Sequence, residues 1–349
     1  MTPPAQSGNA ASELASLLQG AGISRLDDTG WIRVTGEDRV RWLNGMVTNS
    51  IQQMNPGEGT YNFLLSVQGR IQGDANIFAQ PESLLIETSA TQLLPMMALL
   101  DRYIIMDDVE LTDISAEPSG LLIAGPHAAR LLEKIGLTIT AEPGTLEIRA
   151  TLWHDSEVRI IHAHSPLVPR FELWADHVIA DDLFAALQRE GASTCTPESL
   201  EWLRILEGTP AFAIDIRDRE LPQETAQTRA LHFAKGCYLG QEIVERIRSR
   251  GNVHRTFSGF RLEGELPPAG AIFEADGKPI GELTTVATIP LPNAQPTSTH
   301  FALGYVRCEA LERGTPLLYS GGTASPVSLP FLSVAASELH AASESSERV

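Results

Sequence analysis

One cysteine of the chain lies in a segment that favours a reactive thiol. Cys237 belongs to residues 235–250, which read KGCYLGQEIVERIRSR. From Leu239 onward the apolar residues recur at helical spacing, and this pattern predicts a helix that begins there. A helix N-terminus and the ammonium of Lys235 both stabilise a thiolate, the form of cysteine that reacts or binds metal. The alternative is an inert thiol, since a free cysteine is commonly a small buried hydrophobe.

The same segment begins a local concentration of positive charge. Between residues 235 and 261 there are six basic residues and two acids, in a chain whose net charge is −18. The six are Lys235, Arg246, Arg248, Arg250, Arg255 and Arg261. Such a cluster suits a polycarboxylate, a phosphate or a short RNA segment. The alternative is a solvated helix face whose arginines pair with the acidic remainder of the chain.

The overall composition excludes several classes of function. The chain has 349 residues, with 44 Asp and Glu against 26 Lys and Arg. This acidic excess repels phosphate backbones and anionic membranes, so broad nucleic-acid or membrane binding is not expected. No apolar run approaches the roughly 20 residues that cross a bilayer. The first basic residue is Arg25, so no secretory or transit signal is evident and a cytoplasmic location is expected.

Strand and helix patterns alternate up to residue 250 and predict mixed α+β layers that would position these residues. Predicted strands cover residues 30–36, 62–66, 74–78, 84–88 and 121–126. Predicted helices cover residues 38–43, 92–106, 127–135, 180–191 and 197–208. From residue 251 onward, short strands recur about every 8 to 12 residues between glycine and proline turns, which predicts a small β-barrel or sandwich.

Other candidate sites are weaker. His162 and His164 would share one face of a strand, a geometry that could bind metal, but no third ligand is evident and an ordinary histidine pair is favoured. His232 could assist the thiol of Cys237, although an ordinary loop histidine is the better interpretation. The three cysteines are too dispersed for a disulfide framework or a paired metal site.

Residues 235–242 resemble the K-G-C-[FY]-x-G-Q-E signature of the YgfZ family, folate-binding relatives of the glycine cleavage T-protein. All eight residues fit the signature. The resemblance extends over roughly residues 22–307. Further matches are residues 22–26 and 43–49, the S-x-x-G-R hairpin at 66–71, residues 203–210, Asp215 and 221–224, and Gly270, Gly277, Gly281 and Thr284 in the barrel.

This resemblance implies a fold like that of the T-protein, in which two α+β domains and a small C-terminal β-barrel form a ring around a folate pocket. It also implies a role in assembling or repairing iron–sulfur clusters, including those of a radical enzyme that modifies tRNA. The implied cofactor is tetrahydrofolate or another reduced folate, and the implied partners are iron–sulfur enzymes or assembly proteins. Because the chain is acidic, we expect any link to tRNA to run through a client enzyme.

On this basis the chain divides into six parts, in which the segment with the signature completes the folate-binding domain. The parts are a flexible N-terminus (1–19), a first α+β folate-binding region (20–115), a second α+β region (116–195), a return segment with the signature (196–250), a β-barrel (251–336) and a flexible tail (337–349).

The resemblance also implies which residues form the site. Cys237 is predicted to be the chemically active group, with Lys235 beside it. The predicted cofactor-binding residues are Asp74, Arg204, Tyr238, Gln241, Glu242, Arg246, Arg248 and Arg250. No metal site is predicted, because isolated cysteines do not supply the four ligands of a stable cluster within one chain.

The sequence departs from the transferase pattern at two positions. In the T-protein an acidic pair follows the glycine hairpin, and a glutamate lies in the run L-R-L-E-A-G. Here the pair is Gly73-Asp74, and Leu206 takes the apparent glutamate position, with Glu207 one place later. A leucine cannot accept hydrogen bonds from the N–H edge of a pterin.

No complete catalytic constellation is therefore present, and whether the protein catalyses turnover stays open. Cluster assembly or repair ranks above two alternatives. One is a tetrahydrofolate-dependent aminomethyl or methyl transferase of the T-protein class. The other is a scaffold that binds client proteins without a ligand.

Overall fold

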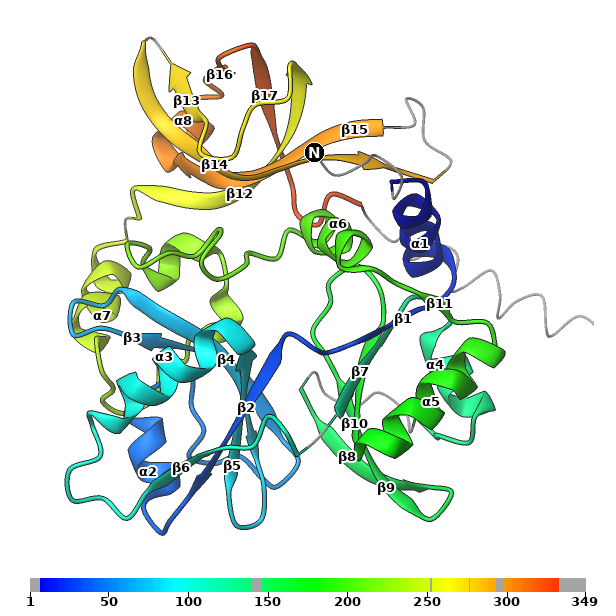
Figure 1. Ribbon diagram of the computed structural model, residues 1–349. Coiled ribbons are helices and arrows are strands. Elements are labelled where there is room, and N and C mark those ends of the chain that lie inside the picture. The colour runs from blue at the N-terminus through cyan, green and yellow to red at the C-terminus, as the bar shows by residue number, and fades with distance from the viewer. Residues whose placement is uncertain are drawn as a thin grey trace, which may run out of the picture.

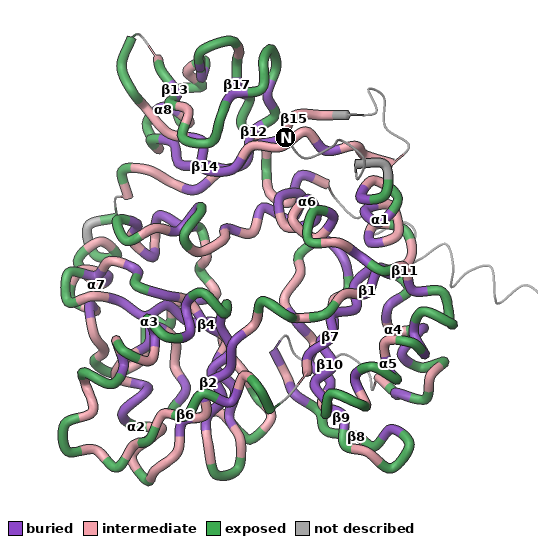
Figure 2. Tube along the Cα trace, viewed as in Figure 1, coloured by how far each residue is buried: buried purple, intermediate pink, exposed green. Residues whose placement is uncertain are grey.

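Two mixed α/β units lie side by side, and a closed β-barrel lies across one end of both (Figure 1). The computed structural model describes residues 7–117, 119–139, 146–251, 253–275, 277–292 and 298–332. Within these residues, no helix is long and apolar enough to cross a membrane. The central strands of both sheets are largely buried, whereas the helices and turns at the periphery expose one side (Figure 2). This arrangement confirms the predicted α+β class with a C-terminal β-barrel.

The first unit contains a five-stranded antiparallel sheet with the order β3-β4-β5-β2-β6. Its elements are β2 (Thr29–Thr35), α2 (Arg39–Asn44), β3 (Gly59–Leu65), β4 (Ile71–Ala79), β5 (Leu84–Ser89), α3 (Ala90–Asp101) and β6 (Glu110–Asp113). Ile77 and Ile86 pack in one apolar cluster with Leu93 of α3. The helix predicted to end at Met106 ends at Asp101, since Met106 is exposed and a further turn would bury no apolar face.

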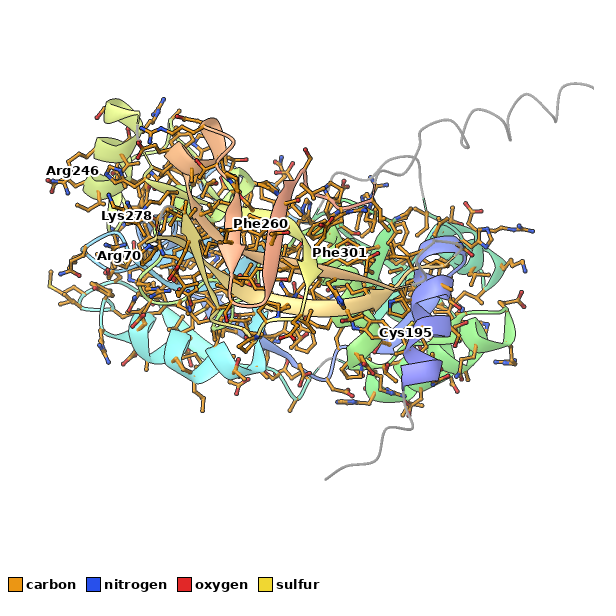
Figure 3. The ribbon with its side chains drawn as sticks, turned by 90° about the horizontal axis from the view of Figure 1, so that it is seen from above. Arg70, Cys195, Arg246, Phe260, Lys278 and Phe301 are labelled. Atoms are coloured by element: carbon orange, nitrogen blue, oxygen red, sulfur yellow. The ribbon has the colours of Figure 1, made fainter. Side chains whose placement is uncertain are left out.

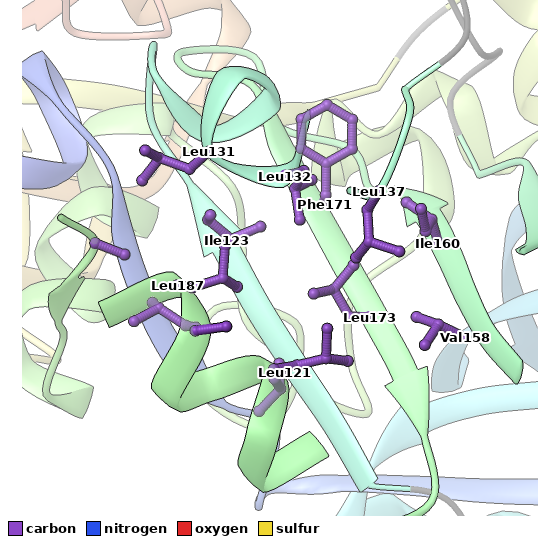
Figure 4. Packing of buried hydrophobic residues seen from close by; sticks show 14 of the residues in the cluster. Leu121, Ile123, Leu131, Leu132, Leu137, Val158, Ile160, Phe171, Leu173 and Leu187 are labelled. Atoms are coloured by element: carbon purple, nitrogen blue, oxygen red, sulfur yellow. The ribbon is translucent and has the colours of Figure 1, made fainter. Parts of the chain in front are cut away.

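The second unit contains a six-stranded sheet with the order β11-β1-β7-β10-β9-β8. Its elements are β1 (Gly22–Arg25), β7 (Ser119–Ala124), α4 (Ala128–Lys134), β8 (Ile148–Trp153), β9 (Ser156–His162), β10 (Arg170–Ala175), α5 (His177–Arg189) and β11 (Ser193–Thr194). Leu121 and Ile123 of β7 pack with Leu132 of α4 and Leu187 of α5 (Figure 4). The prediction placed residues 20–115 in a single region. Because β1 pairs with β7, these residues contribute to both units.

The N-terminal helix α1 (Ser7–Gln19) corrects the prediction of a flexible N-terminus for residues 7–19, and residues 1–6 lie outside the described part of the chain. Leu14 and Leu17 are fully buried, and they share an apolar cluster with α6 (Pro197–Glu207) and the barrel. Glu13 accepts hydrogen bonds from the backbone N–H and the hydroxyl of Thr196 (2.7 and 2.6 Å). The helix is ordered because its apolar face closes a core between the second sheet and the barrel.

The C-terminal barrel closes in the order β12-β15-β14-β13-β16-β17. Its elements are β12 (Arg255–Gly264), β13 (Ile272–Ala275), β14 (Lys278–Pro290), β15 (Ser298–Arg307), α8 (Cys308–Glu312), β16 (Leu317–Tyr319) and β17 (Gly322–Val327). Phe260 and Phe273 fill its interior with ring centroids 4.7 Å apart. Phe301 belongs instead to the cluster shared with α1 and α6, so the barrel is fixed to the rest of the molecule by apolar contact.

The signature segment lies against the hairpin of the first sheet. Between α6 and the barrel the chain forms two short 3₁₀ helices, η1 (Pro222–Thr225) and η2 (Thr228–Ala230), and the helix α7 (Gln241–Arg250). Gly240 has a φ of 80°, and a Cβ there would lie 2.6 Å from the Ser66 carbonyl oxygen. This left-handed residue is the reason that α7 begins at Gln241 and not at the predicted Leu239. A Cβ at Gly69 of the hairpin would likewise lie 2.7 Å from the Cβ of Ile243 in α7.

We predict that Gly240→Ala lowers the free energy of unfolding more than Gly251→Ala does. Both glycines flank α7 with positive φ (80° and 74°), so the intrinsic strain of the substitution is comparable. A Cβ at Gly251 meets nothing within 4 Å, whereas one at Gly240 meets backbone. Urea unfolding should show an extra loss of about 1–3 kcal/mol for Gly240→Ala, and equal losses would contradict the close contact between hairpin and signature.

Candidate functional site

A cavity of about 460 Å³ lies where the two sheets meet. Its walls come from β4 and β5, the first turn of α3, the start of β10 and residues 210–212. Asp74 and Arg204, both predicted to bind a cofactor, contribute to these walls. Carboxyl, amide and guanidinium groups line the cavity together, so it suits a ligand that both donates and accepts hydrogen bonds.

Asp74 is held in the cavity wall by two side chains. The Tyr61 hydroxyl donates to Asp74 Oδ2 (2.6 Å), and the Gln92 amide donates to Asp74 Oδ1 (2.8 Å). Gln92 Oε1 in turn accepts the backbone N–H of Asp74 (3.0 Å). Burial raises the pKa of Asp74, although these donors and the charge of Arg229 oppose the rise. The carboxyl group is therefore fixed in direction and takes up a proton more readily than an exposed aspartate.

Two further carboxyl groups reach the same cavity from opposite sheets, Glu87 from β5 and Glu172 from β10. Asn76 donates to Glu87 Oε2 (2.8 Å), and the Trp174 indole donates to Glu172 Oε2 (3.2 Å). Burial, and then the neighbouring Glu172 carboxyl, raise the pKa of Glu87 well above its ordinary range. The Glu87 carboxyl therefore takes up a proton more readily than an exposed glutamate, and both carboxyl groups offer the cavity hydrogen-bond acceptors.

Arg204 holds α6 against the return segment and the barrel. Its Nε and Nη2 donate to Glu201 (2.7 and 2.6 Å), and Nη1 donates to Asp215 (2.8 Å) and to the Thr209 carbonyl (2.5 Å). Nη2 also donates to the Thr285 hydroxyl (3.3 Å). These bonds use all five N–H donors of a guanidinium. Arg204 therefore shapes the cavity wall but has no N–H left for the cofactor that was predicted to contact it.

The Lys235 ammonium is enclosed by backbone carbonyls of the loop after α2. It donates to the carbonyl oxygens of Asn44 (2.8 Å), Val47 (2.7 Å) and Asn49 (2.5 Å). Burial lowers the pKa of Lys235 to about 8. Since an ammonium has three N–H donors, none is left for the Cys237 thiolate that Lys235 was predicted to support. The position of Lys235 is that of a brace between the signature and this loop.

Cys237 lies at the surface and not among the residues that line the cavity. Its side chain is exposed and its thiol is free. Because α7 begins four positions later, at Gln241, the predicted effect of the helix dipole on this thiol is weak. The Cys237 thiol is therefore accessible from solvent.

The remaining signature residues support the same loop. Gln241 Oε1 accepts the backbone N–H of Tyr238 (3.2 Å), and the Lys235 ammonium lies 5.0 Å from the centroid of the Tyr238 ring. Burial raises the pKa of Tyr238 to about 12. Glu242 is exposed on α7. Among the described residues that form the cavity wall, none of these three predicted cofactor-binding residues occurs.

The predicted anion-binding residues Arg246 and Arg248 of α7 are not among the residues that line the cavity. Figure 3 shows Arg246 at one edge of the molecule, with Cys195 beside α1 toward the other side. Arg248 donates to the Phe233 carbonyl (3.1 Å) and lies over the Phe233 ring, 4.7 Å from its centroid. The side chain of Arg250 lies outside the described part of the chain. Cofactor contact by Arg246 and Arg248 would therefore need a ligand bound at the outer surface of α7.

A series of hydrogen bonds joins the signature loop to the cavity. Lys235 holds the Asn49 carbonyl, and the Asn49 amide donates to the carbonyls of Arg229 (2.9 Å) and Tyr61 (3.3 Å). Tyr61 in turn holds Asp74. The loop that carries Cys237 and the wall that carries Asp74 thus share one support.

Two family models match successive parts of the chain. Residues 4–235 match the GCVT N-terminal domain, and residues 255–331 match the CAF17 C-terminal beta-barrel domain. A curated relative, the tRNA-modifying protein YgfZ of Hamiltonella defensa, is 28% identical over 65% of this chain and 66% of its own length. The chain belongs to the GCVT family, in its YgfZ group.

Other relatives of this YgfZ-group chain cover more of its length. An aminomethyltransferase of Rippkaea orientalis is 22% identical over 90% of this chain and 86% of its own. A chloroplastic protein of Arabidopsis thaliana is 25% identical over 90% and 72%, respectively. The solved glycine cleavage aminomethyltransferase T of Bartonella henselae superposes with a TM-score of 0.80 at 19% identity, covering 93% of this chain and 89% of that one. The predicted T-protein-like fold is confirmed.

The YgfZ-group chain differs from the transferase pattern in three dimensions as it does in sequence. Leu206 is fully buried in the cluster that α6 shares with α1 and the barrel, so no side chain there faces the cavity. Glu207 is also buried, accepts a hydrogen bond from Ser165 and has a pKa raised by burial. Neither residue supplies the carboxylate that the transferase pattern places in the pocket.

A larger hollow of about 600 Å³ beside Trp174 is a weaker candidate for the site. Four of its charged residues are paired with one another, Arg33 with Glu117 (2.5 Å) and Arg159 with Glu157 (2.9 Å). Groups that satisfy one another leave little for a ligand. We therefore place the candidate site in the smaller cavity.

Several residues of this cavity were not predicted from the sequence. They include Tyr61, Glu87, Gln92, Arg170 and Glu172. A signal existed for two of them, because Glu87 and Glu172 each interrupt an otherwise apolar strand, and a charge inside a buried strand needs a partner or a function. The others carried none, since Tyr61 and Gln92 become site residues only through their contacts with Asp74.

His164 lies near the arginines of this region and not on the predicted strand face, because β9 ends at His162. Burial, with the charges of Arg229 and Arg170, lowers the pKa of His164 to about 4. No group of three His, Cys, Asp or Glu side chains in the described residues is placed to hold a metal.

The brace role of Lys235 predicts a loss of stability in Lys235→Met. Three carbonyl oxygens would lose their donor, so the free energy of unfolding should fall by about 1–3 kcal/mol in urea titrations. Lys278→Met, at an exposed lysine of β14, is the matched control and should change little. Equal stability of the two variants would contradict the brace.

His164 should make stability depend on pH. Its pKa of about 4 in the folded protein lies below the ordinary 6.5, so the unfolded chain binds more protons between these values. Stability should therefore fall as the pH drops from 6.5 to 4, and part of this loss should disappear in His164→Gln. His232→Gln, at an exposed histidine, is the control. An unchanged pH profile in His164→Gln would contradict the placement of His164.

Proposed function

We propose that this YgfZ-group protein binds tetrahydrofolate or another reduced folate in its central cavity and acts in iron–sulfur cluster assembly or repair. The observation that carries the proposal is the cavity itself, in which Tyr61 and Gln92 fix Asp74 at the meeting of the two sheets. The effect on tRNA modification would be indirect, through a client enzyme. A cytoplasmic location is part of the same proposal.

The cavity fits a reduced folate in size and in chemistry. Its volume of about 460 Å³ lies within the roughly 300–1,000 Å³ of ordinary small-molecule sites. A pterin ring is flat and presents N–H donors along one edge, and such donors match the carboxyl groups of Asp74, Glu87 and Glu172. Phe212 adds an aromatic surface to the wall. A bound folate would supply the capacity to carry a one-carbon unit.

Each of these residues has a part in holding the ligand. Asp74 would accept a hydrogen bond from a folate N–H, because each carboxylate oxygen can accept a further hydrogen bond beside the one from Tyr61 or Gln92. The carboxyl groups of Glu87 and Glu172 would accept further hydrogen bonds from the ligand. Tyr61 and Gln92 keep the direction of Asp74 constant while the ligand binds.

The iron–sulfur part of the proposal rests on Cys237. An exposed free thiol in the signature can reach a cluster or a cysteine on a client protein. A single thiolate does not hold a cluster by itself, so contact with a cluster would be transient or shared with the client. The relative from Hamiltonella defensa carries the name tRNA-modifying protein, which supports an action linked to tRNA.

The aminomethyl or methyl transferase is the second candidate. The name of the Rippkaea orientalis relative favours it, since that alignment covers 90% of this chain. The buried Leu206 weighs against it, because the carboxylate expected there is absent from the cavity wall. The ligand-free scaffold is the third candidate, and it would assign no ligand to the polar cavity.

Two substitutions should separate folate binding from cluster maintenance. Asp74→Asn should weaken the binding of 5-formyltetrahydrofolate about tenfold or more in calorimetry, because a charged hydrogen-bond acceptor is lost. Cys237→Ser should bind this folate as the wild type does but fail to restore a cluster-dependent enzyme in a deletion strain. Cys308→Ser, at a second thiol that is not fully buried, should restore it.

Each other outcome favours a different function. Full restoration by Cys237→Ser would overturn the role of the cysteine. Sustained turnover of an aminomethylated lipoyl substrate with tetrahydrofolate would favour the transferase. No heat with any reduced folate, mono- or polyglutamylated, would favour the scaffold.

A further inference from the structure

Two arginines at or beside the cavity have hydrogen-bond donors that no close carboxylate occupies. Arg229 donates from Nε to Gln227 (3.3 Å), and no carboxylate of the described residues lies within ion-pair distance of its guanidinium. Arg170 has a buried Nε without a hydrogen-bond partner in the described structure. The ion pair that it forms, with Glu172, is long at 3.8 Å. Both guanidinium groups therefore keep donors available.

The arginines that join the return segment to the barrel differ from Arg229, because each of them has a carboxylate partner. Arg217 and Arg219 share Glu220 and Glu282, and Arg255 pairs with Glu224 (2.9 Å). A half-buried guanidinium without such a partner has lost hydration and gained little in return, so its charge is free for a ligand.

The two arginines lie at the same place although they come from distant segments. Arg170 begins β10 and lines the cavity. Arg229, of η2, stacks on the Tyr61 ring with its guanidinium carbon 3.9 Å from the ring centroid, and Tyr61 lines the cavity. After burial, the charges of Arg229 and Arg170 both lower the pKa of His164, so the three groups lie in one region. One guanidinium group thus lines the cavity and a second lies behind its Tyr61 wall, both close to the carboxyl groups.

The chemistry of these two guanidinium groups indicates a carboxylate. A planar guanidinium matches the two oxygens of a carboxylate and binds it with paired hydrogen bonds. A pterin ring is uncharged, whereas the glutamyl tail of a folate carries carboxylates. On the basis of the proposed function, we propose that Arg170 and Arg229 form a carboxylate subsite that holds the glutamyl tail of the folate.

This subsite takes the place of the anion contact that was predicted for Arg246, Arg248 and Arg250. The Tyr61 side chain links the two ends of the ligand, since its ring carries Arg229 and its hydroxyl holds Asp74. Binding of the tail and binding of the pterin would therefore be connected through one residue.

The test compares three probes on four proteins. The probes are 5-formyltetrahydrofolate, 6-methyltetrahydropterin, which has no carboxylate, and p-aminobenzoylglutamate, which has no pterin. The proteins are the wild type, Arg170→Gln, Arg229→Gln and the control Arg246→Gln, which removes one charge at the edge of the molecule. Calorimetry gives the affinity for the folate, and thermal shift detects the weaker fragments. Unliganded unfolding temperatures show whether each variant is folded.

Arg170→Gln and Arg229→Gln should each bind 5-formyltetrahydrofolate about tenfold or more weakly and lose the p-aminobenzoylglutamate signal. Their response to 6-methyltetrahydropterin and the behaviour of Arg246→Gln should match the wild type. Folate affinity within twofold of the wild type in both variants would overturn the subsite, as would a loss confined to Arg246→Gln. If Arg229→Gln is unfolded, Arg170→Gln decides alone.

Failure of the proposed function gives a different result. The wild type would then bind none of the three probes, whereas failure of the subsite leaves the wild type able to bind 5-formyltetrahydrofolate. If the wild type binds 6-methyltetrahydropterin but not p-aminobenzoylglutamate, the folate site is supported and the carboxylate subsite is overturned.

Discussion

The packing of one sheet against the other is the constraint on which the site depends. Trp174 of β10 meets Trp31 and Phe78 of the first sheet edge to face, with ring centroids 5.6 and 5.4 Å apart. Such contacts bury large apolar areas and fix the distance between the sheets. Beside these rings, Glu87 and Glu172 approach each other from opposite sheets. Burial there raises the pKa of Glu87, and each carboxyl group accepts a hydrogen bond, from Asn76 and from Trp174. The cavity is the polar margin of this interface, so neither unit contains it alone.

The second feature of the molecule is the separation of its two chemical groups. Asp74 is fixed inside the ring of domains, whereas Cys237 is exposed on the outer loop of the signature. The Lys235 ammonium joins them by holding the loop whose Asn49 contacts the backbone beside Arg229 and Tyr61. A ligand that moves Tyr61 or Arg229 would act on the support of the cysteine loop. This arrangement suits a protein that binds a small molecule at one place and a client at another.

Much of the fold follows from local patterns, but the site does not. Alternation and helical spacing predict β2, β5, α4 and α6 within a few residues, because each buries one face of a regular element. The helix α1 was missed because its polar start concealed Leu14 and Leu17, which are buried against elements distant in sequence. Asp74 was predicted through a family resemblance. Arg229 and Glu172 were not predicted, because their roles depend on contacts between segments that are distant in sequence.

The central claim is that the ligand lies between the sheets and not at the basic outer surface of α7. A crystal structure of the protein grown with 5-formyltetrahydrofolate tests it directly. The account predicts electron density for the ligand in the central cavity, with an N–H of the pterin facing Asp74 and the glutamyl carboxylate facing Arg229. Density against Arg246 and Arg248 on α7, with an empty cavity, would contradict it.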